Sequence, residues 1–265
     1  MLPFFRKIRF RLAQDNQFLK YSRYAIGEIV LVVIGILIAL QVNDWNKERI
    51  NRIEENTYLQ RLVQNLNRDL YNVKASTSVH EETLIRCTQV LDSLGKANIG
   101  RIKDGEAYSN ALKKHKANQF NNPNTLGEQF FNILVISLFY KSDIAFQELL
   151  STGKIDIIKN QDLKSAIQEH YLLVTEYQNF QDRIVMEIQN NYREALIKNN
   201  ISSINNESYS LLKDRITDSA GLIVAIENYM NISAATLNLF IYNENSLQKS
   251  TERLIHQISN ELNKP

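Results

Sequence analysis

The stretch AIGEIVLVVIGILIALQV, residues 25–42, decides how this chain is organised. Twelve consecutive residues within it, Ile29–Leu40, have no polar side chain. Eighteen helical residues rise roughly 27 Å, which is close to the ~30 Å thickness of the hydrocarbon core of a bilayer. We therefore expect residues 25–42 to form a single transmembrane helix.

The flanks of this segment indicate its orientation. Residues 1–24 hold six Lys and Arg residues against one acidic residue, Asp15, which is a balance of +5. Basic flanks remain on the cytoplasmic side of a membrane, and Tyr and Trp rings favour its interfaces. Tyr21 and Tyr24 lie at one edge of the segment and Trp45 lies at the other. In a bacterium this pattern predicts an inner-membrane protein with a cytoplasmic N-terminus and a periplasmic C-terminal domain.

Two alternatives for residues 25–42 are a cleaved signal peptide and a buried core helix. Signal peptides have a short basic region and a small-x-small cleavage site. Here the basic region is long, and the triplet Ala39-Leu40-Gln41 ends in a bulky polar residue, so we favour an anchor. Residues 4–19 also resemble a short amphipathic helix with basic residues opposite its apolar face, which predicts contact with anionic lipid. The alternative is that this stretch serves only as a topology signal.

Two features inside the span suggest function. Gly27, Gly35 and Ala39 lie at multiples of four residues, and small residues at that spacing let helix backbones approach closely. Glu28 is an ionisable residue within the span, which is by default a functional hypothesis. The simpler interpretation is that its carboxylate reaches back to the lipid headgroups. The packing face predicts a protein partner or a second copy of the chain.

Tyr24–Asn46, YAIGEIVLVVIGILIALQVNDWN, resembles the signature of a bacterial family of uncharacterised single-span membrane proteins that carries only a domain-of-unknown-function label. Phe146–Ile158, FQELLSTGKIDII, followed by Leu163 and Tyr171, resembles the centre of the same family. The resemblance implies a basic N-terminal stretch, one span and a large part beyond it. The family has no catalytic residues to carry over, so the resemblance implies no chemistry.

Beyond the span the apolar residues follow helical periodicity. Between residues 43 and 93 there is neither Gly nor Pro, so we expect the span to continue directly into a long helix. Steps of four and three residues sustain a seam typical of a coiled coil for five heptads. The seam consists of Leu59, Val63, Leu66, Leu70, Val73, Thr77, His80, Leu84, Cys87, Leu91 and Leu94.

The remainder of the chain predicts further helices. Asn160 is expected to cap a helix with a second seam of the same kind, formed by Leu163, Ile167, His170, Val174, Tyr177, Gln181, Ile184, Ile188 and Ala195. Ser142 is expected to cap a helix that stops at Gly153, and residues 155–158 form a brief run that favours an extended conformation. Asp218 or Ser219 should cap a last helix that the polar residues 243–245 break or solvate. Helices are also expected over residues 104–118, 128–140 and 208–216, with a loop over 119–127.

These patterns predict an all-α protein: an N-terminal transmembrane helix running into a long helix, followed by an extracytoplasmic helical bundle. Its parts would be a basic cytoplasmic segment (1–24), the span (25–42) and a periplasmic bundle domain (43–265).

Motifs for catalysis or metal binding do not occur. The chain has four His and one Cys, and they form neither HExxH nor Glu-x-x-His. Gly-rich phosphate loops and G-x-S-x-G are also missing from the sequence. His80 and Cys87 lie seven residues apart on the first seam, where core residues belong. We therefore predict no catalytic, cofactor-binding or metal-ligating residue and no cofactor.

The sequence favours a membrane-anchored, non-enzymatic helical scaffold or a subunit of an envelope complex. One alternative is an extracytoplasmic sensor that binds a ligand between its helices and acts through a partner. Another is an ion-flux accessory subunit that uses Glu28. Membrane lipid and a protein partner or second copy are the expected partners, and nucleic acid is not.

Overall fold

A computed structural model of the chain describes residues 18–96, 109–110, 113, 126–201 and 216–264. Every regular element in those residues is a helix, which confirms the all-α fold class. Four expected segments fall wholly or largely outside the described residues: the amphipathic helix at 4–19, the helices at 104–118 and 208–216, and the loop at 119–127. The chain divides into two compact units, Met1–Asn56 and Thr57–Pro265.

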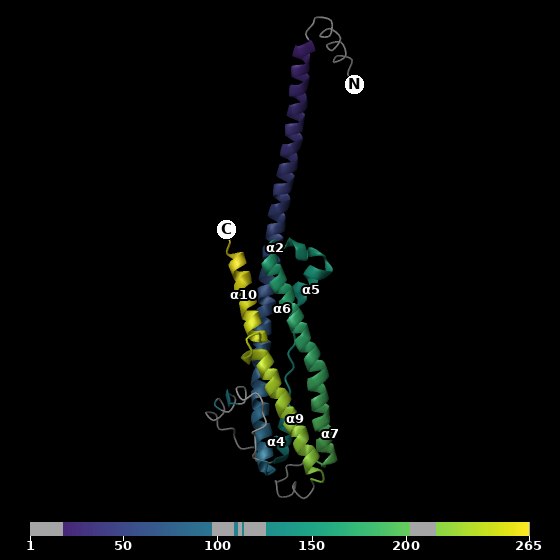
Figure 1. Cartoon of the computed structure of the whole chain (residues 1–265), viewed down its shortest axis with the longest axis vertical. Coiled ribbons are helices and arrows are strands. Elements are labelled where there is room, and N and C mark those ends of the chain that lie inside the picture. The colour runs from purple at the N-terminus through teal and green to yellow at the C-terminus, as the bar shows by residue number, and fades with distance from the viewer. Residues whose placement is uncertain (1–17, 97–108, 111–112, 114–125, 202–215, 265) are drawn as a thin grey trace. The chain divides into compact units, whose positions relative to one another are not determined.

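Helix α2 runs without a break from Phe18 to Ser93, so the prediction of one continuous helix is confirmed (Figure 1). Its end is closed by Gly95, which has φ +77°. The Gly95 amide donates to the Asp92 carbonyl at 3.0 Å, and the Lys96 amide donates to the Leu91 carbonyl at 2.9 Å. This bonding pattern is the Schellman motif, which needs a left-handed residue where a glycine has no steric penalty.

The second unit is built on the part of α2 beyond residue 57. Three clusters of buried side chains follow one another along it, around Leu62, Val73 and Cys87. Helix α6 (Gln161–Phe180) packs beside α10 (Leu247–Leu262), and α7 (Met186–Lys198) packs beside α9 (Ser219–Leu237), as Figure 1 shows. Every residue of the first predicted seam is buried or half-buried.

The second seam holds as far as Gln181 and then shifts. A single π-helical turn, η2 (Gln181–Val185), joins α6 to α7 and inserts one extra residue. Ile184, predicted to be buried, is therefore 39% exposed, and Val185 takes its place at 1% exposed. Beyond the turn the buried positions are Gln189, Tyr192 and Leu196 rather than the predicted series.

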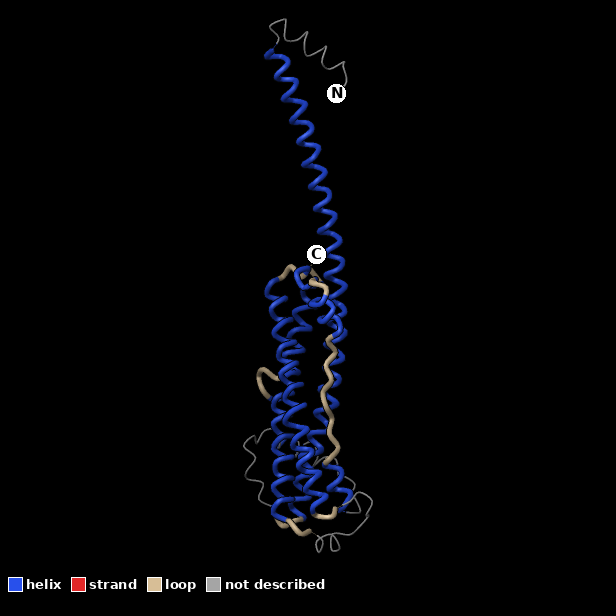
Figure 2. Tube along the Cα trace, turned by 90° about the vertical axis from the view of Figure 1, so that its right-hand side faces the viewer, coloured by secondary structure: helices blue, strands red, loops and turns tan. Residues whose placement is uncertain are grey.

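The helix predicted over residues 128–140 is only half correct. Helix α4 runs only from Leu126 to Ile133. Residues 134–142 continue as an extended chain, which is drawn tan in Figure 2. We call residues 134–142 the extended segment. Its residues Val135–Tyr140 are all β-branched, apolar or aromatic except Ser137, and such residues favour extended backbone.

The helix ends are set by local side chains. Asn160 caps α6 by accepting from the Leu163 amide at 3.1 Å, and Asp218 caps α9 by accepting from the Gly221 amide at 2.9 Å, both as predicted. Helix α5 (Ile144–Ser151) has Asp143, not Ser142, at its N-cap position.

Two further boundaries concern short segments. Residues 155–157 are not extended, because a 3-10 turn (Lys154–Ile157) follows Gly153 in the left-handed region, and only Ile158 has extended backbone. The last helix breaks after the π turn η3 (Asn238–Tyr242), and Asn243 has extended backbone. This confirms that the polar residues at 243–245 interrupt it.

Candidate functional site

The residues singled out in and beside the candidate span, residues 25–42, all lie on α2. Its most apolar 18-residue window has a mean hydropathy of 2.6, and none of that window is buried by the rest of the chain. Tyr24 and Trp45, the expected interface anchors, are 80% and 64% exposed, and Tyr21 is half-buried. Within the described residues this is one helix long and apolar enough to cross a membrane.

Because α2 is helical throughout residues 25–42, the angular positions of these residues follow from about 100° per residue. Gly27, Gly35 and Ala39 fall within an arc of roughly 120°. Glu28 falls inside the same arc, between Gly35 and Ala39. Beyond their own helix, neither Gly27 nor Gly35 has any atom near the position that a Cβ would occupy. The small-residue face and the carboxylate are thus one face of the helix, and it is open.

The Cys–His pair on the first seam is part of the core. Cys87 is fully buried, and burial raises the pKa of its thiol well above the usual range. His80 is 3% exposed, forms a hydrogen bond with the backbone of Ser137, and has its pKa lowered to about 4 by burial. A buried neutral thiol is a poor nucleophile, so both residues serve packing, as the seam predicted.

A polar cleft of about 470 Å³ opens between α6 and α10. His170 and Ser250 lie in its wall, with 3.0 Å between Nδ1 and Oγ. The Nε2 atom of His170 is buried and has no hydrogen-bond partner. Burial lowers the pKa of His170 to about 4, which makes it a weak base for activating a serine hydroxyl. The other polar residues of the wall are Glu169, Asn245, Arg253 and Gln257.

A ladder of side chains holds the extended segment against the helices on either side. From α2, Ser76 Oγ donates to the Ser137 carbonyl and Asn72 Nδ2 donates to the Tyr140 carbonyl, each at 2.8 Å. Asp69 Oδ1 accepts from the Ser142 amide at 2.7 Å. Asp69, Asn72, Ser76 and His80 are three or four residues apart, so they share one face of α2.

The opposite side of the segment is held by two glutamines. Gln181 bonds both the amide and the carbonyl of Phe139, and Gln189 Nε2 donates to the Leu134 carbonyl at 3.1 Å. Of the segment's residues only Phe139 is fully buried, and Val135 and Tyr140 are exposed. Where backbone groups of such a segment are shielded from water and have no strand partner, side chains must satisfy them in some such way. Sequence reasoning missed this ladder because Asp69 and Ser76 are polar residues on a buried face.

Asp69 is the one ladder residue that titrates near neutrality. It is fully buried, and desolvation raises its pKa to about 7 despite the bond from Ser142. Its second oxygen, Oδ2, has no hydrogen-bond partner, and neither does the buried hydroxyl of Tyr171. The pKa of Tyr171 is raised by burial first and then by the charges of Asp69 and Asp143.

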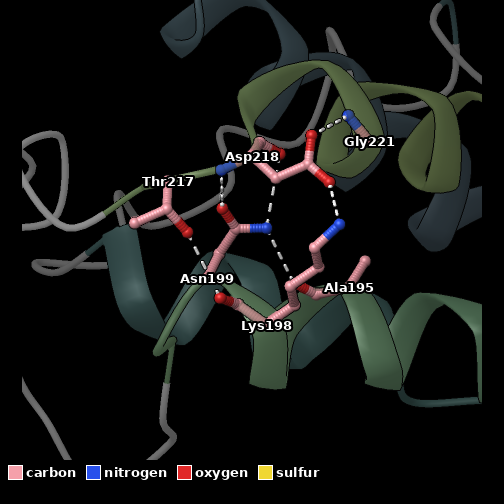
Figure 3. A network of polar contacts seen from close by, with 6 residues as sticks. All are labelled: Ala195, Lys198, Asn199, Thr217, Asp218 and Gly221. Atoms are coloured by element: carbon pink, nitrogen blue, oxygen red, sulfur yellow. Dashed lines mark hydrogen bonds and ion pairs between the residues drawn. The ribbon is translucent and has the colours of Figure 1, made fainter.

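The junction of α7 and α9 is closed by a separate network (Figure 3). Asn199, at the end of α7, accepts from the Asp218 amide at 2.7 Å and donates to the Ala195 carbonyl at 2.9 Å. Lys198 Nζ donates to Asp218 Oδ2 at 2.6 Å. These contacts hold together two helix ends that are far apart in sequence.

The comparisons with known proteins identify a family. The sequence model of DUF6090, described as a family of unknown function, matches residues 28–174, which is more than half of the chain. The chain belongs to the DUF6090 family. The DUF6090 match begins at Glu28 and includes the α2 side of the ladder and Tyr171. No curated protein and no solved structure matches the chain.

Metal ligands do not gather in the described part of this DUF6090 member. Among those residues, no three His, Cys, Asp or Glu side chains are close enough together to hold a metal ion. The features that the geometry offers are therefore the open face of the candidate span, the cleft between α6 and α10, and the ladder around the extended segment.

Proposed function

We propose that this protein is a membrane-anchored helical scaffold, a non-enzymatic subunit of an envelope complex in the bacterial inner membrane. The observation that carries the proposal is the contrast between its two units. None of the side chains in the apolar window of α2 is buried, whereas the unit beyond residue 57 has a buried core of its own. An exposed apolar helix of this length is stable in lipid and unstable in water.

The orientation follows from the basic N-terminal stretch, which favours a cytoplasmic N-terminus. Alkaline phosphatase fused after Pro265 should be active, because it would reside in the periplasm, and the same reporter fused after Tyr21 should be inactive. Activity only from the fusion after Tyr21 would contradict the proposal.

The scaffold role requires contacts through the span. Cys87→Ser leaves a chain without cysteine, into which one cysteine is placed at Gly35, where a Cβ meets nothing within 4 Å. Oxidation in native membranes should then give a disulfide-linked dimer or a mixed disulfide with a partner. The matched control is Leu37→Cys, which is about 200° around the helix from Gly35. Equal products from both positions would reject a specific face.

The cleft between α6 and α10 favours a second candidate, an extracytoplasmic ligand-binding module that signals through a partner. Polar groups converge on its wall, and the buried Nε2 of His170 has no partner within the protein. A ligand of this cleft should raise the melting temperature of the full chain in detergent. The rise should be lost in Arg253→Ala and retained in Glu187→Ala, an exposed site on α7.

A further inference from the structure

The bonds that hold the extended segment differ in their response to protons. Those at Leu134, Ser137, Phe139 and Tyr140 come from the amides of Gln and Asn and the hydroxyl of Ser76, which do not titrate. His80, which also bonds Ser137, has its pKa lowered to about 4 and is neutral at physiological pH. The Ser142 end alone depends on a carboxylate, that of Asp69.

We propose that residues 140–142 form a proton-operated latch, which is closed on α2 when Asp69 is protonated and released when Asp69 ionises. The inference concerns the folded bundle and does not depend on the scaffold role. Release would free the segment that leads directly into α5, which begins at Ile144.

The surroundings of Asp69 disfavour its charge. Its side chain is fully buried, and Oδ2 has no hydrogen-bond partner. The amide and the hydroxyl of Ser142 favour the anion, but burial outweighs them. Tyr171 of α6 lies near enough to interact with it electrostatically. Lys141, the nearby cation, is already paired with Asp143 at 3.0 Å. The negative charge of Asp143 repels an ionised Asp69 and so raises its pKa. The positive charge of Lys141 lowers that pKa by a smaller amount.

Opening relieves this cost because water can then solvate the carboxylate, which gives up its proton to the solvent. In the closed latch Asp69 titrates near 7, whereas a solvated Asp titrates near 3.9. Since the closed state binds more protons between these values, its stability falls as pH rises from about 4 to about 7, and it changes little above. Buried His80 and His170 have lowered pKa values and therefore act in the opposite direction.

The opening is expected to be local. Phe139, just before the latch, is 1% exposed and packs edge-on against Phe240 at 5.9 Å between ring centroids. Both of its backbone groups are bonded to Gln181. Residues up to 139 are thus anchored by contacts that do not titrate. Release of Tyr140, which is 68% exposed, costs little burial and breaks one further bond, the one from Asn72.

Amide hydrogen exchange of the full chain in detergent tests the latch. After correction for intrinsic rates, protection of the Ser142 amide should fall on the order of 50-fold between pH 5 and pH 7.5, as the difference between the two pKa values dictates. Asp69→Asn keeps an acceptor for that amide without a charge, so its protection should be high and independent of pH. Asp162→Asn, at an exposed site on α6 that does not affect the pKa of Asp69, is the matched control and should retain the pH dependence.

A Ser142 amide equally protected at both pH values in the wild type would overturn the proposal, and so would an unchanged pH dependence in Asp69→Asn. If Asp69→Asn fails to fold, the carboxyl carbon of Asp69 in the wild type is followed by NMR. Titration of that carbon near pH 7 together with loss of Ser142 protection supports the latch. Titration near pH 4 overturns it.

Discussion

Gln181 bonds both backbone groups of Phe139. Its Oε1 atom accepts from the Phe139 amide at 2.8 Å, and its Nε2 atom donates to the Phe139 carbonyl at 3.1 Å. A carboxamide used in this way replaces the neighbouring strand that an extended residue ordinarily needs. Gln181 is also the first residue of the π turn between α6 and α7. The same residue, Gln181, therefore begins the π turn and anchors the extended segment.

Replacing Gln181 should destabilise the protein substantially. Gln181→Leu leaves a buried donor and a buried acceptor of Phe139 unpaired, at about 1–3 kcal/mol for each such group. Gln181→Glu keeps an acceptor for the amide but turns an oxygen toward the carbonyl, so it should destabilise as well. Urea unfolding of the full chain in detergent measures both, against the exposed site Gln168→Leu. A change below about 0.5 kcal/mol in Gln181→Leu would contradict this role.

The departures from the sequence-based prediction have the same physical origin. Residues 128–140 are apolar on most sides, and such a run is compatible with a buried helix or with a buried extended chain. What decides between them is a supply of backbone partners, which here come from residues as distant as Asn72 and Gln181. A distant partner leaves no local signal.

The two seams show what periodicity could find. The four-three pattern located the buried face of α2 and the first half of the second seam, because burial of apolar side chains follows the helical repeat. It missed Asp69 and Ser76, since their burial is supported by bonds to the extended segment. The π turn shifted the later positions by one residue, as Ile184 shows. The basic charge of residues 1–24 and the length of the apolar stretch 25–42 were enough to locate the candidate span.

Removal of Asn199 should loosen the junction of α7 and α9. Asn199 is fully buried and bonds both the Ala195 carbonyl and the Asp218 amide. Asn199→Ala should lower the free energy of unfolding by about 2 kcal/mol, because buried backbone groups lose their partners. Asn190→Ala, at an exposed site on α7, is the control and should change it by less than about 0.5 kcal/mol. Chemical denaturation compares the two, and equal effects would show that the junction contributes nothing.

Cys87 should resist thiol reagents in the native state. Burial removes access and raises the pKa of the thiol, so little thiolate is present at pH 8. Labelling with a maleimide should be at least about 100-fold slower than for a cysteine at exposed Lys74 in a Cys87→Ser background. Cys87→Ser itself should preserve assembly. Fast labelling of Cys87, or loss of function in a well-folded Cys87→Ser chain, would restore the nucleophile hypothesis.

The carboxylate of Glu28 provides the last test, because it shares a helix face with Gly35. If Glu28 only reaches to the headgroups, Glu28→Gln preserves function, since the amide keeps the volume and most of the polarity. A charge at the centre of a span costs roughly 3 kcal/mol of insertion free energy and less near the interface. The neutral variant should therefore insert at least as well as the wild type.

If instead the Glu28 face contacts a partner, the charge has a counterpart there, and its loss leaves that group unpaired in lipid. Glu28→Gln should then reduce the crosslinked product formed by a cysteine at Gly35, at equal abundance in the membrane. The position of Glu28 within the arc of small residues favours this outcome, since a carboxylate that only reached the headgroups could lie on any face. Unchanged crosslinking in Glu28→Gln, beside a clear loss in Gly27→Leu, would show that the face packs through its small residues alone and that the charge serves only the interface.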